Sequence, residues 1–245
     1  METGDLIELT DEDYRYIKNV LRLRPGEAIA LFGYRGHEYQ ALIHEIAGGK
    51  VLVKIAGVQT LPESNIQITL AQALPKGDKM DFIVQKATEL GVNGIIPFHS
   101  SRSIPKLLES KALERVKRWR KIALEAARQS GRGDIPEIEE ITTYPELLKR
   151  TDRKGLNLIF WEAESGCGIK QILRNEQNAE PNNFFIAVGP EGGFSGEEVQ
   201  AAITAGMTSV SLGKQVLKVE TASLAILAII QYERGLMGIT ADKDI

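Results

Sequence analysis

Residues 184–199, FFIAVGPEGGFSGEEV, join an apolar run to a glycine-rich turn and then to the start of a helix. The run FFIAV is typical of a strand buried on both faces of a parallel sheet. Ser195, followed three residues later by Glu198, matches a capping box, which marks the first turn of a helix. The three glycines of GPEGG let the backbone bend sharply and let another group approach it closely. By itself, the turn also fits an ordinary corner between a strand and a helix.

Apolar strands and helices alternate on both sides of this stretch. Strands are predicted at 66–74, 94–98, 156–160, 184–188 and 210–212, and helices at 78–90, within the segment 101–132, at 196–205 and at 220–234. Continuous apolar strands separated by helices predict a parallel sheet that is covered on both faces. The predicted fold class of this part is therefore α/β.

The first 60 residues follow a different pattern, with short apolar or alternating runs separated by turns. Strands are expected at 28–32, 39–46 and 50–58, with a helix at 11–21 that packs on them. The polar, proline-bearing segment 59–65 is expected to link the two parts. We therefore expect a small β-barrel-like domain over residues 1–62 and an α/β domain over residues 63–245.

The overall composition is that of an ordinary globular protein, with 43% hydrophobic and 26% charged residues. The single cysteine, Cys167, cannot form an internal disulfide, and the three histidines are too dispersed for a metal-ligand cluster. The N-terminal segment lacks a signal-peptide pattern, and no stretch reaches about 18 uninterrupted apolar residues. These features predict a cytoplasmic protein with no metal and no membrane partner.

Charge and apolar residues are unevenly distributed along the chain. The net charge is −3, yet segment 101–132 contains ten Lys or Arg against three Glu. This segment fits either a solvated helix face or, better, a surface that contacts a phosphate backbone. The last helix is apolar on every side, as TASLAILAII at 221–230 shows. Such a helix must be buried all round, either inside its own domain or, as we expect, at a subunit interface.

A second glycine-bearing junction, VSLGKQVLKVETA at 210–222, repeats the arrangement of strand, turn and helix. Both junctions follow the carboxyl end of a predicted parallel strand, where ligands bind in open α/β sheets. Neither matches the two commonest phosphate-binding loop patterns. Because Val216 and Leu217 would lie beside free backbone polar groups, the two loops suit a ligand such as an adenine ring.

An ordered set of motifs makes the chain resemble the SPOUT-class methyltransferases. The set is NVLRLRPGE, LPKGDK, QKATELGV, Ser101-Arg102-Ser103, KRWRKIALEAARQSGR, GPEGGFS and LGKQVLKVETA, and it extends over nearly the whole chain. It is most similar to the bacterial family that methylates N3 of one uridine in 16S ribosomal RNA. The resemblance implies a SPOUT α/β domain with a deep trefoil knot, which is an exception among folds, and an N-terminal PUA-like RNA-binding barrel. It also implies a homodimer formed through the knot, S-adenosylmethionine as methyl donor, and 16S rRNA within the small ribosomal subunit as substrate.

The resemblance also implies which residues form the site. The implied donor contacts are Phe160, Glu162, Val188, Gly189, Pro190, Glu191, Gly192, Gly193, Leu212, Gly213, Val216, Leu217 and Ala222. Candidates for holding the RNA are Arg22, Lys76, Lys79, Lys86, Arg102, Arg128 and Arg132. The catalytic candidates are Arg102, Glu191 and Lys218, since uridine N3 must lose its proton and nearby cations lower its pKa. Glu191 could act as a base or orient the substrate, and it could equally be a carboxylate at a helix terminus.

Two departures from the family pattern fall in the last loop, where Gln215 and Lys218 replace the usual arginines. Lysine keeps the charge but loses the bidentate fork of arginine. Elsewhere, Glu89 could be a structural partner of Lys86. Two other functions stay open: a SPOUT methyltransferase that acts on the 2′-oxygen of ribose, and an RNA-binding or assembly factor without catalysis.

Overall fold

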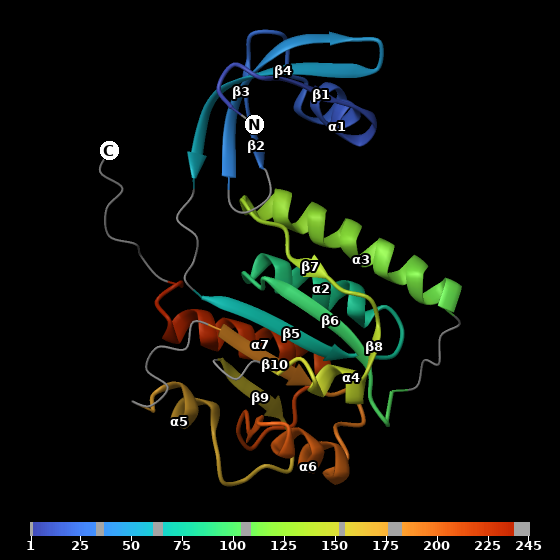
Figure 1. Ribbon diagram of the computed structural model, residues 1–245, viewed down its shortest axis with the longest axis vertical. Helices are drawn as coiled ribbons and strands as arrows, with labels where there is room; N and C mark the ends of the chain where they lie inside the picture. Colours follow the sequence, from blue (N-terminus) through green and yellow to red (C-terminus); the bar gives the residue numbers. More distant parts are fainter. Residues whose placement is uncertain are drawn as a thin grey trace. The chain divides into compact units, whose positions relative to one another are not determined.

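The computed structural model describes residues 2–32, 37–60, 66–103, 109–151, 155–175 and 183–237. The chain forms two compact units, Met1–Glu63 with Gly131–Asp134, and Ser64–Ser130 with Ile135–Ile245 (Figure 1). The first unit is built mainly of strands and the second alternates strands with helices, so the predicted classes are confirmed for both. Within the described ranges, no helix has the length and apolar character needed to cross a bilayer.

The first unit is an antiparallel sheet with the strand order β1-β4-β3-β2. Its elements are β1 (Leu6–Leu9), α1 (Asp11–Arg15), η1 (Tyr16–Leu21), β2 (Ala28–Phe32), β3 (His37–Ala47) and β4 (Lys50–Thr60). Alternate residues of β3 and β4, such as Ile43 and Val53, form the core together with Ile17. The predicted helix at 11–21 is present, but its second half is a π-helix that ends at Leu21, and the C-cap residue Arg22 has a φ of 55°. Strand β1 was not predicted.

The second unit contains a parallel sheet with the order β11-β9-β10-β5-β6-β7, and β8 also pairs with β6. The strands are β5 (Gln67–Ala73), β6 (Gly94–His99), β7 (Glu137–Ile138), β8 (Thr142–Thr143), β9 (Leu156–Phe160), β10 (Asn183–Val188) and β11 (Thr208–Val210). Every residue of β9 is buried, as expected for an interior strand covered on both faces. The predicted parallel sheet is thus confirmed, and the carboxyl ends of β9, β10 and β11 share one edge.

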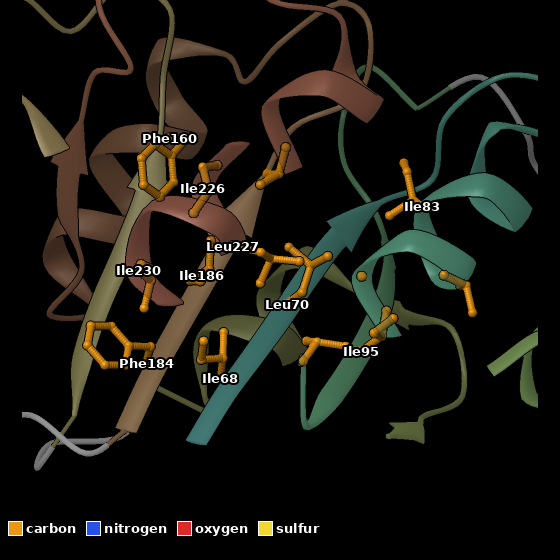
Figure 2. Packing of buried hydrophobic residues seen from close by; sticks show 14 of the residues in the cluster. Ile68, Leu70, Ile83, Ile95, Phe160, Phe184, Ile186, Ile226, Leu227 and Ile230 are labelled. Atoms are coloured by element: carbon orange, nitrogen blue, oxygen red, sulfur yellow. The ribbon is translucent and has the colours of Figure 1, made fainter. Parts of the chain in front are cut away.

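Helices cover both faces of this sheet. They are α2 (Lys79–Glu89), α3 (Glu109–Ser130), α4 (Tyr144–Leu148), α5 (Ile169–Leu173), α6 (Gly196–Thr204) and α7 (Val219–Glu233). One core cluster packs the sheet against α2, α3, α5 and α7, and a second packs it against α4 and α6. Figure 2 shows Ile226, Leu227 and Ile230 of α7 beside Ile186 and Phe184 of β10.

Two expectations about the C-terminal part need correction. Strand β11 begins two residues before the predicted 210–212, and Ser211 makes only an isolated bridge with Gly168. Full burial of the last helix inside its own domain is wrong, because its buried residues form one stripe that includes Ile226 and Ile230 while Tyr232 is 67% exposed. Burial of the remaining apolar side by a second copy of the chain stays a prediction.

Candidate functional site

A cavity of about 430 Å³ opens where β9, β10 and β11 end. It is lined by residues 160–162, 188–193 and 210–219, with Lys79 from α2 and Ala222 from α7. All thirteen positions implied for the methyl donor lie in this lining. Trp161, Lys214 and Gln215, which lie inside the implied loop ranges 160–162 and 212–217, also line it, whereas Val210, Ser211 and Val219 were not predicted. The carboxyl edge of a parallel sheet is where such a ligand site is expected.

The first loop, residues 188–193, requires glycine at two positions. Gly193 has a φ of +65°, and its N–H donates to the carbonyl of Pro190 at 2.9 Å. A Cβ on Gly193 would lie 2.1 Å from Oε1 of Glu162, so a side chain there would displace a carboxylate of the cavity wall. A Cβ on Gly189 would lie 3.2 Å from backbone atoms of Gly193 and Phe194. The tight turn therefore depends on these two glycines.

An aromatic cluster anchors the end of the first loop. The ring of Phe194, which is 1% exposed, lies 6.2 Å from that of Phe98 and 5.8 Å from that of Tyr144. Burial, together with the charge of Glu198, raises the pKa of Tyr144, whose hydroxyl donates to the carbonyl of Glu198 at 2.8 Å. Ser195 and Glu198 form the predicted capping box. The loop is thus fixed to the core and to the first turn of α6.

Arg102, in the turn after β6, packs against the first loop. Its Nη1 donates to the carbonyl of Gly192 at 2.7 Å, and the N–H of Ser101 donates to Oε1 of Glu198 at 2.7 Å. The other carboxylate oxygen of Glu198 accepts the N–H of Ser195 at 2.9 Å. The buried Glu198 carboxylate therefore joins the turn that carries Arg102 to the end of the first loop. Arg102 itself lies outside the cavity lining.

Glu191 is held by two donors from the LPKGDK segment. Lys79 Nζ lies 2.8 Å from Glu191 Oε1, and the N–H of Lys76 donates to both carboxylate oxygens at 3.1 and 3.2 Å. Partial burial acts to raise the pKa of Glu191, but the Lys79 ammonium and the backbone N–H groups outweigh it and hold the pKa below its usual value of 4.5. A carboxylate with a lowered pKa is a weak base at neutral pH, which disfavours Glu191 as the proton acceptor.

The second loop, residues 211–218, is much more exposed. Val216 is 82% exposed, and no side chain caps α7 at Lys218. Gly213 has a φ of +118°, and its N–H donates to Ser211 Oγ at 3.2 Å. Lys218 lines the cavity as an exposed N-cap residue. It is therefore positioned to approach a molecule that enters from solvent.

The candidate RNA residues are dispersed rather than gathered at the cavity. Lys86 Nζ lies 2.7 Å from Glu89 Oε1, so Glu89 is the structural partner of Lys86 that the sequence indicated as one possibility. Arg128 pairs with Glu125 at 3.6 Å and Arg132 with Asp134 at 2.6 Å. Arg22 belongs to the first unit. Of the seven candidates, the structure brings Lys79 alone into the described lining of the cavity.

Comparison with known proteins agrees with this architecture. Residues 62–231 match the model of the RNA methyltransferase domain, and residues 9–56 match that of the RNA methyltransferase PUA domain. The chain is 32% identical over 240 residues to the ribosomal RNA small subunit methyltransferase E of Bacillus subtilis, covering 97% of this chain and 94% of that protein. The chain belongs to the ribosomal RNA small subunit methyltransferase E family. The family's protein from Mesomycoplasma hyopneumoniae is 35% identical over 221 residues, covering 89% of this chain and 91% of that protein.

Solved structures support the same membership. A ribosomal RNA small subunit methyltransferase E from Neisseria gonorrhoeae, bound to S-adenosyl methionine, has a TM-score of 0.84 and 34% identity, covering 95% of this chain and 93% of that chain. A methyltransferase from Legionella pneumophila in complex with the same cofactor has a TM-score of 0.82 and 32% identity, with the same two coverages. The predicted resemblance and the PUA character of the N-terminal part are confirmed.

Proposed function

We propose that this protein transfers a methyl group from S-adenosylmethionine to N3 of a uridine in 16S ribosomal RNA. The main support is the cavity at the ends of β9, β10 and β11, because its lining contains every position implied for the donor. The relatives' names give small-subunit ribosomal RNA as their substrate, and the protein from Neisseria gonorrhoeae is described with the donor bound.

The residues of the cavity fit this donor. Val188, Leu212 and Leu217 offer aliphatic surface to an adenine ring, while the glycine-rich first loop leaves backbone polar groups accessible. Glycine at 193 leaves room for the Glu162 carboxylate in the wall, because a Cβ there would collide with it. When bound there, S-adenosylmethionine would supply an electrophilic methyl group on a positively charged sulfur.

The protein must lower the cost of removing the proton from uridine N3, since the lone pair of the neutral base is delocalised. Cationic groups near the base stabilise the resulting anion. We assign this task to Arg102 and Lys218. Arginine has five N–H donors, so the hydrogen bond from Arg102 to Gly192 leaves donors to meet the base. Transfer then depends mainly on holding the two reacting atoms in line.

Binding of the RNA would involve both units. The PUA domain and the exposed lysines of α3, such as Lys111 and Lys117, would contact phosphates. The further candidates are Arg22 and Arg132 of the first unit, Lys86 of α2 and Arg128 of α3. We propose a homodimer in which a second copy covers the half-buried Leu224, Ala225 and Ile229 of α7. A trefoil knot in the second unit, as in the SPOUT class, completes the proposed fold.

The experiment incubates the protein with methyl-labelled S-adenosylmethionine and small ribosomal subunits that lack the modification, or with free 16S rRNA. The RNA is digested to nucleosides and analysed by mass spectrometry. The expected product is 3-methyluridine. A 2′-O-methylated nucleoside would instead assign the protein to ribose methylation. The absence of both transfer and donor binding by calorimetry would support an RNA-binding factor without catalysis.

A further inference from the structure

Lys79, the first residue of α2, lies between two walls of the cavity. Its Nζ is 2.8 Å from Oε1 of Glu191 and 3.7 Å from Oε2 of Glu220. Glu191 belongs to the first loop, and Glu220 lies in the first turn of α7, directly after the second loop. One ammonium group therefore faces a carboxylate from each of the two loop regions that form the site.

The surroundings make this ammonium group important to both carboxylates. The side chains of Lys79, Glu191 and Glu220 are only 37%, 25% and 22% exposed, so the three charges are partly shielded from water. Oε2 of Glu220 is buried and has no hydrogen-bond partner among the described residues. The Lys79 charge at 3.7 Å is therefore its compensating partner. Glu191 also accepts the backbone N–H of Lys76, so both of its donors come from the LPKGDK segment.

We infer that Lys79 is a positioning residue that clamps the first loop to the start of α7 and thereby sets the affinity for the donor. Without its ammonium group, two carboxylates would face one another without a shared cation, and the walls of the cavity would separate. The fraction of molecules competent to bind would fall, and the apparent affinity would fall with it. Glu191 then serves as one half of the clamp and not as a base, and Lys79 is not an RNA contact.

This role rests on the proposed function, so donor binding is measured first on the unaltered protein. Isothermal titration with S-adenosylmethionine is compared for the wild type, Lys79→Met, Glu191→Gln and the double variant. We expect Lys79→Met to weaken binding about tenfold and Glu191→Gln about threefold. The double variant should be no weaker than Lys79→Met, because both changes remove the same interaction. Lys79→Arg, which keeps the charge, should recover most of the affinity.

Lys76→Met is the matched control, since Lys76 holds Glu191 through its backbone N–H and not through its side chain. It should bind the donor like the wild type. Steady-state rates should show a raised KM for S-adenosylmethionine in Lys79→Met, with kcat at saturating donor changed by less than about threefold. Glu220→Gln tests the same contact from the α7 side and should weaken donor binding about threefold. It keeps the proposal testable if the Lys79→Met protein does not fold.

Three results would overturn the clamp. The first is a Lys79→Met protein that binds the donor like the wild type but has a raised KM for RNA and a weaker salt dependence, since this describes a phosphate contact. The second is strict additivity of Lys79→Met and Glu191→Gln. The third is a loss confined to kcat. A wild-type protein that does not bind S-adenosylmethionine would instead refute the proposed function, and with it the basis of the clamp.

Discussion

The two glycine loops that form walls of the cavity are built in opposite ways. In the first loop, residues 188–193, Gly189 and Pro190 are buried and the carbonyl of Gly192 is held by Arg102. In the second loop, residues 211–218, every side chain from Lys214 to Lys218 is exposed. The first loop ends on a buried aromatic ring, whereas the second ends on a helix start without a side-chain cap.

This difference predicts separate roles for the two loops in donor binding. A wall that is already fixed loses little conformational entropy when a ligand arrives, whereas an exposed wall must be ordered at the moment of binding. The first loop should therefore set the shape of the site, and the second should close on the ligand. Substitutions in the first loop should affect folding and binding together, and those in the second should affect binding alone.

The largest contrast is expected between Phe194→Ala and Val216→Ala. Removing the buried Phe194 ring should lower the free energy of unfolding by about 3–5 kcal/mol, because it leaves a cavity among Phe98 and Tyr144. Val216 is 82% exposed, so its truncation should change stability by less than about 0.5 kcal/mol. Chemical denaturation measures both values, and equal losses would remove the distinction between the two loops.

A second contrast concerns glycines. Gly189→Val should abolish measurable donor binding, with a loss of at least about 100-fold, or about 2.7 kcal/mol, because even a Cβ would lie 3.2 Å from fixed backbone atoms. In Gly213→Ala the new Cβ would have no atom within 4 Å, and the only cost is the strain of a positive φ. We therefore expect this variant to bind the donor about tenfold more weakly. Calorimetry with S-adenosylmethionine provides the comparison.

Arg102→Ala should retain donor binding while reducing methyl transfer, because Arg102 lies outside the lining of the cavity. Equal loss of donor binding in Arg102→Ala and Gly189→Val would contradict the assigned roles.

The sequence predicted the parts of the fold whose signal is carried by side chains. β9 and β10 are mostly apolar, with Asn157 as the polar residue inside β9, and the predicted bounds of both lie within one residue of the observed ones. β11 was placed two residues too late, because Thr208 and Ser209 pair with β9 through the backbone while the apolar residues lie further on. The short elements β7, β8, α4 and α5 were missed because two to five residues show no period.

Parts of the site could likewise be predicted from the sequence, and parts could not. The family motifs predict most of the residues that line the cavity, because glycine loops at strand ends can be recognised from a short stretch of sequence. The contacts that fix the first loop could not be read from the sequence. Arg102 lies 90 residues from Gly192, and Lys76 lies 115 residues from Glu191. The strand order brings them together: Lys76 follows β5 and Glu191 follows the neighbouring β10, while Arg102 follows β6 on the other side of β5.

A third prediction concerns Glu198, whose carboxylate accepts hydrogen bonds from Ser101, in the turn that carries Arg102, and from Ser195, at the end of the first loop. Glu198→Gln replaces one acceptor oxygen by a donor, so either Ser101 or Ser195 loses its partner inside a buried region. We expect a loss of about 1–3 kcal/mol in the free energy of unfolding and a lower kcat. Ser195→Ala is the control that removes only the helix cap, at a cost of about 1 kcal/mol. A kcat equal to that of Ser195→Ala would show that Glu198 acts as a cap alone.

The smallest effect concerns the pH dependence of the first loop. The pKa of Glu191 is lowered below its usual value of 4.5, so its ionised form stabilises the native state above pH 4.5, and this contribution is lost as the pH falls through the lowered pKa. The pKa of Lys79 is raised above 10.5 by its bond to Glu191, so the ammonium stays charged throughout the neutral range. The ratio of donor affinities between the wild type and Glu191→Gln should thus be constant from about pH 6 to pH 9.

Below pH 4.5 this ratio should fall from about threefold toward one, because protonation gives the wild type the same uncharged side chain as the variant. Calorimetry of the two proteins at matched pH measures it, and the other carboxyl groups of the cavity cancel in the comparison. The same variant should keep its kcat within about threefold at pH 7. A fall in kcat of about 100-fold or more would identify Glu191 as the proton acceptor, and the first loop would then be part of the chemistry as well as a fixed wall.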